Sequence, residues 1–236
     1  HSSGPAPSAH GSAYEGTRAR VEHYFDRTAT RVWERLTSDA PVSRIRETVR
    51  QGRDRMRETM LDQLPADLTG MRVLDAGCGA GQMTAELAAR GARVTAVDIS
   101  PSLVGIAEAR LPEAHRGRVT FLAGDMLDPA LGNFDHIVAM DSLIYYSAED
   151  IARALDGFAN RTRSTVFTVA PRTPLLMAMW HAGKVFPRAD RSPVMIPHAP
   201  ARLADALRAA RRGGRLREVA RISRGFYIST CLEART

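Results

Sequence analysis

Short apolar runs alternate with longer amphipathic segments through the middle of this chain. The runs have the length and composition of buried strands, and they cover residues 72–76, 93–98, 119–123, 134–140 and 164–170. Between them, apolar residues recur at helical spacing over about 81–90, 101–111 and 149–161. Each crossover is long enough to bring the chain back to a parallel strand, so the pattern predicts an α/β fold with a doubly wound sheet.

The segments that flank this alternating core follow different patterns. Residues 14–64 carry apolar side chains on a helical stripe, and Pro41 divides them into two helices that we expect over the carboxyl edge of the sheet. Residues 172–200 combine an apolar stretch with several prolines, which predicts a substrate-binding insertion. The chain then ends in a helix and an antiparallel hairpin, expected over 201–211, 216–223 and 226–232. The sheet therefore has seven strands and is mostly parallel.

These patterns divide the chain into three parts. We expect a disordered, tag-like tail over 1–13, an N-terminal helical lid over 14–66 and one α/β domain over 67–236. The chain has 236 residues, of which 44% are hydrophobic, so it can bury a core of the size that such a domain needs.

The charge and the cysteine content of the chain indicate which partners and which cellular compartment to expect. The formal net charge is +7 and Lys184 is the only lysine, so arginine supplies nearly all of the positive charge. This balance fits either a codon bias toward arginine or attraction to an anionic substrate, partner or lipid surface. No nucleic-acid motif accompanies it, so DNA and RNA are not expected partners. The low number of cysteines, two, is typical of a reducing compartment. We also expect no membrane span, which needs an apolar run of about 20 residues, and no secretory leader, so the sequence predicts a cytoplasmic protein.

The first predicted strand runs into a turn with glycine at alternate positions, Gly77, Gly79 and Gly81. A dinucleotide-binding fingerprint would place its third glycine at position 82, where this chain has glutamine. The shorter spacing, with Asp75 before it, resembles motif I of the class I methyltransferases that use S-adenosylmethionine (SAM). SAM has no pyrophosphate and instead offers a carboxylate, an amine and a sulfonium. A turn that places an acid beside exposed backbone amides suits such a ligand.

Acidic residues also follow the other strands, at the edge where open α/β sheets bind ligands. We expect Asp98 to accept from both ribose hydroxyls, Ile99 to pack on the adenine and Asp125 to accept from its exocyclic amine. The predicted SAM contacts are Asp75, Ala76, Gly77, Cys78, Gly79, Gly81, Asp98, Ile99, Ser100, Gly124, Asp125, Met126, Met140, Asp141 and Ser142. The alternative for the acids is helix N-capping, and for the glycines a role in backbone geometry alone.

Two segments in the first quarter of the chain narrow the class further. Residues 24–33 read YFDRTATRVW and residues 42–53 read VSRIRETVRQGR. Both resemble motifs of the magnesium-protoporphyrin IX O-methyltransferases, with the bacteriochlorophyll branch the closer fit, and the match continues through 141–146, 173–174 and 186–187. The resemblance implies a Rossmann-like class I methyltransferase fold. It also implies methyl transfer from SAM to a porphyrin propionate, giving the monomethyl ester and S-adenosylhomocysteine (SAH).

The same resemblance marks Tyr24 and Tyr145 as candidate catalytic residues. Tyr24 is expected to hydrogen-bond the propionate, and many relatives carry histidine at position 145, where this chain has tyrosine. A propionate is already ionised at neutral pH and a phenol has a pKa of about 10, so we expect Tyr145 to orient the carboxylate rather than act as a base. The alternative for both side chains is aromatic packing between lid and core.

A flat macrocycle needs an apolar slot with cations at one end for its propionates. The expected substrate-binding residues are Trp33, Arg172, Met177, Trp180, Arg191 and His198, with His198 a candidate axial ligand for the porphyrin's magnesium. The alternative is that the Met and Trp side chains belong to the core. No spacing suggests a metal held by the protein itself. The resemblance further suggests the magnesium chelatase large subunit as a partner and peripheral contact with the photosynthetic membrane.

Two other functions fit parts of the pattern. A ubiquinone-type methyltransferase would methylate a phenol, and it would need a histidine base or a metal near residues 141–146 to deprotonate that phenol. A non-catalytic SAM-binding subunit would bind SAM without turnover of a porphyrin. The intact glycine turn and its acids argue against this second alternative.

Overall fold

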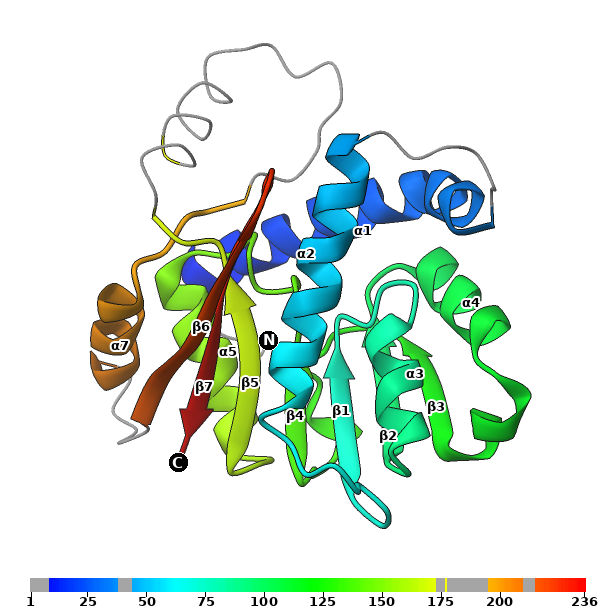
Figure 1. The fold of residues 1–236 in the computed structure, drawn as a ribbon. Helices are drawn as coiled ribbons and strands as arrows, with labels where there is room; N and C mark the ends of the chain where they lie inside the picture. Colours follow the sequence, from blue (N-terminus) through cyan, green and yellow to red (C-terminus); the bar gives the residue numbers. More distant parts are fainter. Residues whose placement is uncertain (1–8, 38–43, 173–176, 178–194, 210–214) are drawn as a thin grey trace, which may run out of the picture.

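The computed structural model describes residues 9–37, 44–172, 177, 195–209 and 215–236. Its centre is a seven-stranded sheet in the order β3-β2-β1-β4-β5-β7-β6 (Figure 1). The strands are β1 (Arg72–Ala76), β2 (Arg93–Asp98), β3 (Val119–Ala123), β4 (His136–Ala139), β5 (Ser164–Val169), β6 (Arg215–Arg224) and β7 (Tyr227–Arg235). The predicted α/β fold with seven strands is confirmed.

Strand pairing follows the order expected for βαβ units. β1 pairs in parallel with β2 and β4, as do β2 with β3 and β4 with β5. β7 runs antiparallel between β5 and β6. The predicted hairpin is confirmed, and its turn contains Gly225, whose positive φ of 56° suits glycine. The fourth strand is shorter than predicted, since it begins at His136 and ends at Ala139.

Helices connect and cover the strands. They are α1 (Ala9–Thr37), α2 (Arg44–Leu61), α3 (Gln82–Ala89), α4 (Pro101–Arg110), α5 (Ala148–Ala159) and α7 (Pro200–Ala209), with 3₁₀ turns η1 (Glu113–Arg118) and η2 (Pro129–Leu131). Serines cap two of them, because Ser100 Oγ accepts from an amide of α4 and Ser147 Oγ from an amide of α5. Helix α1 begins at Ala9, so residues 9–13, expected in the disordered tail, belong to the first helix.

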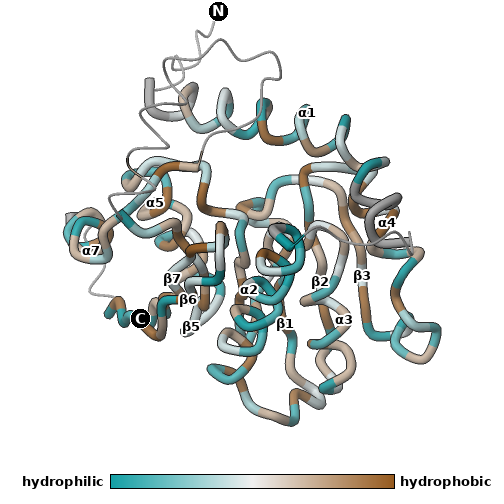
Figure 2. The backbone as a smooth tube through the Cα atoms, turned by 45° about the horizontal axis from the view of Figure 1, so that its top comes forward, coloured by the Kyte–Doolittle hydropathy of each residue, from teal (hydrophilic) through white to brown (hydrophobic). Residues whose placement is uncertain are grey.

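The helices cover the two faces of the sheet with separate apolar layers. On one face, α5 and α7 contribute Phe158 and Leu203 to the core. On the other face, α2 and α3 contribute Met56, Met60 and Leu87. Each of these side chains is 1% exposed or less. Most of α2 is hydrophilic in Figure 2, which fits a helix that buries only the residues facing the sheet.

The two N-terminal helices take different positions. Helix α1 crosses the carboxyl ends of the parallel strands (Figure 1), where Asp26 accepts from the Ser100 hydroxyl and the Ser102 amide at the start of α4. Helix α2 instead runs along a face of the sheet against β6 and β7. The predicted position over the carboxyl edge is therefore confirmed for α1. It is wrong for α2, because the apolar residues of α2 join the core of the domain.

Two glycines let α2 lie directly on the hairpin. A Cβ on Gly52 would sit 2.7 Å from the Tyr227 ring, and a Cβ on Gly225 would sit 2.5 Å from Thr48 Oγ1. Both distances are too short for a normal contact, so the close approach excludes side chains at these two positions. Thr48 and Gly52 belong to the motif over 42–53, and docking of α2 on the hairpin explains their place in it.

Gly52→Ala should destabilise the fold by about 1–3 kcal/mol, because the added methyl group overlaps the Tyr227 ring. Gly105→Ala in α4 is the matched control. A Cβ there meets nothing within 4 Å, and alanine is the better helix former by up to about 1 kcal/mol. Urea unfolding of both variants measures the difference. Equal stability of the two would contradict the close packing of α2 on the hairpin.

Candidate active site

The glycine turn follows β1 and joins several parts of the site. Gly77, Gly79 and Gly81 have φ values of 82°, 52° and 87°, in the left-handed region that favours glycine. A Cβ on Gly77 would lie 2.4 Å from Ser142 Cβ, and a Cβ on Gly81 would lie 2.8 Å from Ala107 Cβ. At Gly79 a Cβ would meet nothing within 4 Å. The turn therefore packs tightly at both ends and presents open backbone in its middle.

Asp98 ends β2 and fixes this turn from the side. Its Oδ2 accepts from the Gly79 amide and its Oδ1 accepts from the Ser100 amide, both at 2.9 Å. Asp98 is 9% exposed, and burial raises the pKa of its carboxyl although the two amides lower it. A carboxylate has lone pairs beyond these two bonds, so Asp98 can hold the turn and still accept from ribose hydroxyls.

Two predicted contact residues are buried beneath the turn. Asp75 is 1% exposed, and its Oδ2 accepts a 2.6 Å hydrogen bond from the Thr84 hydroxyl of α3. Burial raises the pKa of Asp75 to about 7. Cys78 is also buried, which holds the pKa of its thiol well above the ordinary value. Asp75 therefore anchors α3 to β1, and its contact with SAM stays a prediction.

The end of β4 forms the second side of the site. Asp141 adopts a positive φ of 55°, which is uncommon for a residue other than glycine. Its amide donates to Thr168 Oγ1 at 2.8 Å, and the Thr168 hydroxyl donates to Asp141 Oδ1 at 3.2 Å. The Ser142 hydroxyl donates to the Ala76 carbonyl at 2.8 Å. The Ser142 bond holds the residues after β4 against the start of the glycine turn, and the Thr168 bonds fix them to β5.

Two residues outside the predicted set converge on the Asp141 carboxylate. Tyr227 of β7 donates its hydroxyl toward Oδ1 and Oδ2 at 3.3 and 3.4 Å, and Arg53 of α2 places Nε 3.4 Å from Oδ2. Burial, and then the charge of Asp141, raises the pKa of the Tyr227 phenol. The sequence signal for Arg53 is its place at the end of the motif over 42–53. Neither composition nor spacing marks Tyr227.

The two predicted catalytic residues meet in an aromatic cluster between α1 and the loop after β4. The Phe25 ring lies edge-on to both, with its centroid 5.2 Å from that of Tyr24 and 5.9 Å from that of Tyr145. Burial raises the pKa of the Tyr145 phenol, and the charge of Asp141 raises it further while Arg53 lowers it. Tyr145 therefore stays protonated at neutral pH and is available as a hydrogen-bond donor.

Helix α1 covers a hollow at the ends of β2 and β3. The hollow has a volume of about 190 Å³ and is lined by Arg18, Glu22, Ile99, Pro101, Ala123, Gly124 and Asp125. Arg18 lies 2.9 Å from Asp125 Oδ2, and Tyr14 donates its hydroxyl to Asp125 Oδ1 at 3.2 Å. The predicted adenine contacts Ile99, Gly124 and Asp125 thus share one hollow. Sequence reasoning missed Tyr14 and Arg18, which already engage the acid.

Three further predicted contacts have structural roles. Met126 is 8% exposed and belongs to the core layer that contains Phe158 of α5. Met140 packs against the opposite layer, beside the residues of α2 and α3. Ser100 is fully buried and caps α4. The side chains of these three residues therefore support the site from below.

The predicted porphyrin-binding residues are described only in part. Trp180 and Arg191 lie outside the described residues, as does the side chain of Trp33 in α1. Arg172 is exposed and Met177 is partly exposed. The slot expected around 172–200 therefore stays a prediction.

His198 has a structural position. It is 6% exposed, its Nε2 lies 2.7 Å from the Tyr146 carbonyl, and its amide donates to the Ala170 carbonyl. Burial lowers the pKa of the imidazole, so the ring stays neutral. The expectation of an axial magnesium ligand is corrected, because His198 ties the segment before α7 to the loop after β4.

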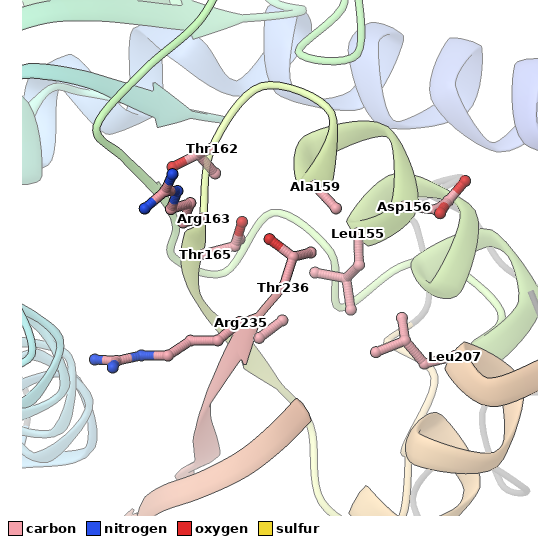
Figure 3. Close-up of a pocket in the computed structure, with 10 residues that line it drawn as sticks. Leu155, Asp156, Ala159, Thr162, Arg163, Thr165, Leu207, Arg235 and Thr236 are labelled. Carbon is pink, nitrogen blue, oxygen red and sulfur yellow. The ribbon is translucent and has the colours of Figure 1, made fainter. Parts of the chain in front are cut away.

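A second hollow lies at the opposite end of the sheet, away from the glycine turn. Residues of α5 and α7 and the ends of β5 and β7 line it, including Leu155, Thr165, Leu207 and Thr236 (Figure 3). Its volume of about 20 Å³ holds about one water molecule. The carboxyl edge of the sheet therefore remains the candidate site.

Comparison with known proteins adds to this geometry. Residues 139–236 match a family model described as magnesium-protoporphyrin IX methyltransferase C-terminus, and residues 73–165 match a methyltransferase domain. Magnesium-protoporphyrin O-methyltransferase of Rhodobacter capsulatus is 61% identical over 226 residues, which cover 95% of this chain and 99% of that protein. The enzyme of that name from Synechocystis PCC 6803 is 30% identical over 91% of this chain and 94% of its own.

A solved structure agrees. Magnesium protoporphyrin IX methyltransferase from Synechocystis PCC 6803, with bound SAH, has a TM-score of 0.77 and 30% sequence identity. The match covers 92% of this chain and 98% of that one, so it includes far more than the widespread methyltransferase domain. The chain belongs to the magnesium-protoporphyrin O-methyltransferase family.

Proposed function

We propose that this chain transfers the methyl group of SAM to a propionate carboxylate of Mg-protoporphyrin IX, giving the monomethyl ester and SAH in bacteriochlorophyll synthesis. One observation of the site carries the proposal beside family membership. Tyr24 and Tyr145, from two separate family motifs, lie in one aromatic cluster. The charge of Asp141, at the end of β4, raises the pKa of the Tyr145 phenol. Tyr145 follows Ser142, which packs on the glycine turn, so the cluster joins the side of the site where an acceptor would meet a bound methyl donor.

The residues around the glycine turn fit SAM. The backbone at Gly79 faces open space, Asp98 keeps lone pairs for ribose hydroxyls, and Ile99 lines the hollow proposed for adenine. When bound, SAM supplies a sulfonium methyl group, to which a carboxylate oxygen forms a C–O bond as the C–S bond breaks, with no proton released. The negative charge of the carboxylate and the positive charge of the sulfonium cancel.

The task of the chain's own residues is to place an ionised carboxylate and to keep water away. A propionate has a pKa of about 4 to 5 and is ionised at neutral pH, so no general base is required. Tyr145 stays protonated and donates a hydrogen bond that orients the carboxylate, and the Tyr24 hydroxyl donates a second hydrogen bond from α1. Phe25 contacts both rings and shields them from the side of α1.

The phenol-methylating alternative needs a base near residues 141–146. Tyr145 is unsuited to that role, because burial and the Asp141 carboxylate raise the pKa of its phenol instead of lowering it. The carboxylate acceptor is therefore the substrate that this site supports.

We also propose two partners from the family resemblance. They are the magnesium chelatase large subunit, as the source of the porphyrin, and the surface of the photosynthetic membrane, as a peripheral contact. The net charge of +7 supports attraction to an anionic surface. None of the helices in the described ranges combines the length and apolar character that a membrane span requires.

Incubation with methyl-labelled SAM and Mg-protoporphyrin IX should give the labelled monomethyl ester.

In the same assay Tyr145→Phe should lower turnover only modestly, by the value of one positioning hydrogen bond, about 0.5–1.5 kcal/mol. Tyr145→His should keep activity, as the family resemblance implies. Between about pH 6.5 and 8.5 the rate should show no inflection that depends on residue 145, because its phenol stays protonated. A thousandfold loss in Tyr145→Phe, with loss of an inflection near pH 7, would make Tyr145 a base.

SAH should slow hydrogen exchange across residues 14–31 of α1. Tyr14 and Arg18 hold α1 beside the hollow through the Asp125 carboxylate, so a ligand that fills the hollow adds contacts to α1. The last turn and a half of α2, which contains the buried Met56, Met60 and Leu61, is the internal control, because the core protects it in both states. Equal exchange of α1 with and without SAH would mean that α1 is a fixed layer.

A further inference from the structure

Arg53 stands on a rigid part of the site. It belongs to α2, whose residues Met56 and Met60 are fully buried and whose Gly52 lies against the Tyr227 ring. Its guanidinium reaches the end of β4, where Nε lies 3.4 Å from Asp141 Oδ2. A side chain on a core helix is placed more exactly than one on a loop, so its position beside the acceptor site is well defined.

The ion pair with Asp141 leaves most of this guanidinium available. It uses Nε at 3.4 Å, and the Arg53 side chain is 53% exposed. Within the part of the chain that the structure describes, this is the ion pair that Arg53 makes, so both Nη groups can still bind a planar acceptor. Arg50, one turn earlier on α2, differs because it pairs with Glu47 of its own helix at 2.8 Å.

A carboxylate that enters beside Tyr145 needs a nearby positive charge. The charges of Asp141 and Asp98 both raise the pKa of the Tyr145 phenol, whereas Arg53 lowers it. Arg53 also lowers the pKa of the Tyr227 phenol on the other side of Asp141. The guanidinium therefore acts on this part of the site from α2 and offsets the repulsion that the two acids would exert on an incoming anion.

We propose that Arg53 binds the propionate carboxylate that becomes methylated, beside the hydroxyls of Tyr24 and Tyr145. The inference rests on the proposed function and adds the subsite that holds the reacting group. It also places a substrate cation on α2, in a motif that precedes the sheet, whereas the sequence pattern marked Arg172 and Arg191.

The change in charge during methyl transfer determines whether Arg53 contributes to substrate binding or to the transition state. Methyl transfer removes the negative charge of the carboxylate, so the attraction to Arg53 is stronger before the transition state than in it. Loss of Arg53 should therefore raise KM for the porphyrin and leave kcat nearly unchanged. The Asp141 carboxylate limits the pull of Arg53 on the substrate, so the reacting oxygen keeps its nucleophilicity.

The test compares two porphyrins on three proteins. Fluorescence titration gives the Kd of Mg-protoporphyrin IX and of its dimethyl ester, which lacks both negative charges, for the wild type, Arg53→Gln and the matched control Arg50→Gln. The wild type should prefer the diacid, and Arg53→Gln should reduce this preference about tenfold through weaker binding of the diacid alone. Arg50→Gln should keep the full preference, and Arg53→Lys should keep part of it.

Other outcomes overturn the inference. Equal weakening of both porphyrins in Arg53→Gln would mean that Arg53 only supports the structure of α2 and β4. An unchanged preference would mean that the carboxylate binds elsewhere. Failure of the wild type to form the monomethyl ester would instead refute the proposed function, whereas ester formation with an unchanged preference would refute only the role of Arg53.

Discussion

The close approach of the glycine turn to its neighbours fixes the end of β4 and helix α4 relative to β1 at the carboxyl edge of the sheet. Gly77 leaves no room for a Cβ beside Ser142, and Gly81 leaves none beside Ala107 of α4. Any side chain at either position would push the turn away from the end of β4 or from α4. The turn, the acceptor side and α4 therefore form one packed unit, and Asp98 locks the turn from β2.

The two sides of the site are built by different principles. The donor side comes from successive strand ends of one sheet, as in other open α/β folds. The acceptor side instead combines four elements, since α2 and β7 contact Asp141 at the end of β4 and α1 contacts Tyr145. Gly52 makes this possible because it lets α2 lie on the Tyr227 ring. The motifs over 24–33 and 42–53, which precede the sheet in sequence, thus lie in the same site as Tyr227 of the last strand.

Local pattern was sufficient to predict the strands, the hairpin and the glycine turn, because each depends on nearby residues. Contacts between distant segments were not predictable in this way. The burial of Asp75 under α3, the position of α2 on a sheet face and the pairing of Tyr227 with Asp141 each depend on tertiary packing. His198 shows the converse error, because an isolated histidine suggested a metal ligand where the fold uses a buried hydrogen bond.

Calorimetric titration of SAH into Asp98→Ala tests most directly whether the carboxyl edge around the glycine turn is the cofactor site. Loss of charge-assisted bonds to ribose, worth about 1.5–3 kcal/mol each, predicts that SAH affinity falls tenfold or more. Asp128→Ala is the control, since Asp128 accepts from the Ala130 amide in a turn outside the site. Urea unfolding shows whether both variants remain folded. Wild-type affinity in a folded Asp98→Ala protein would contradict the account.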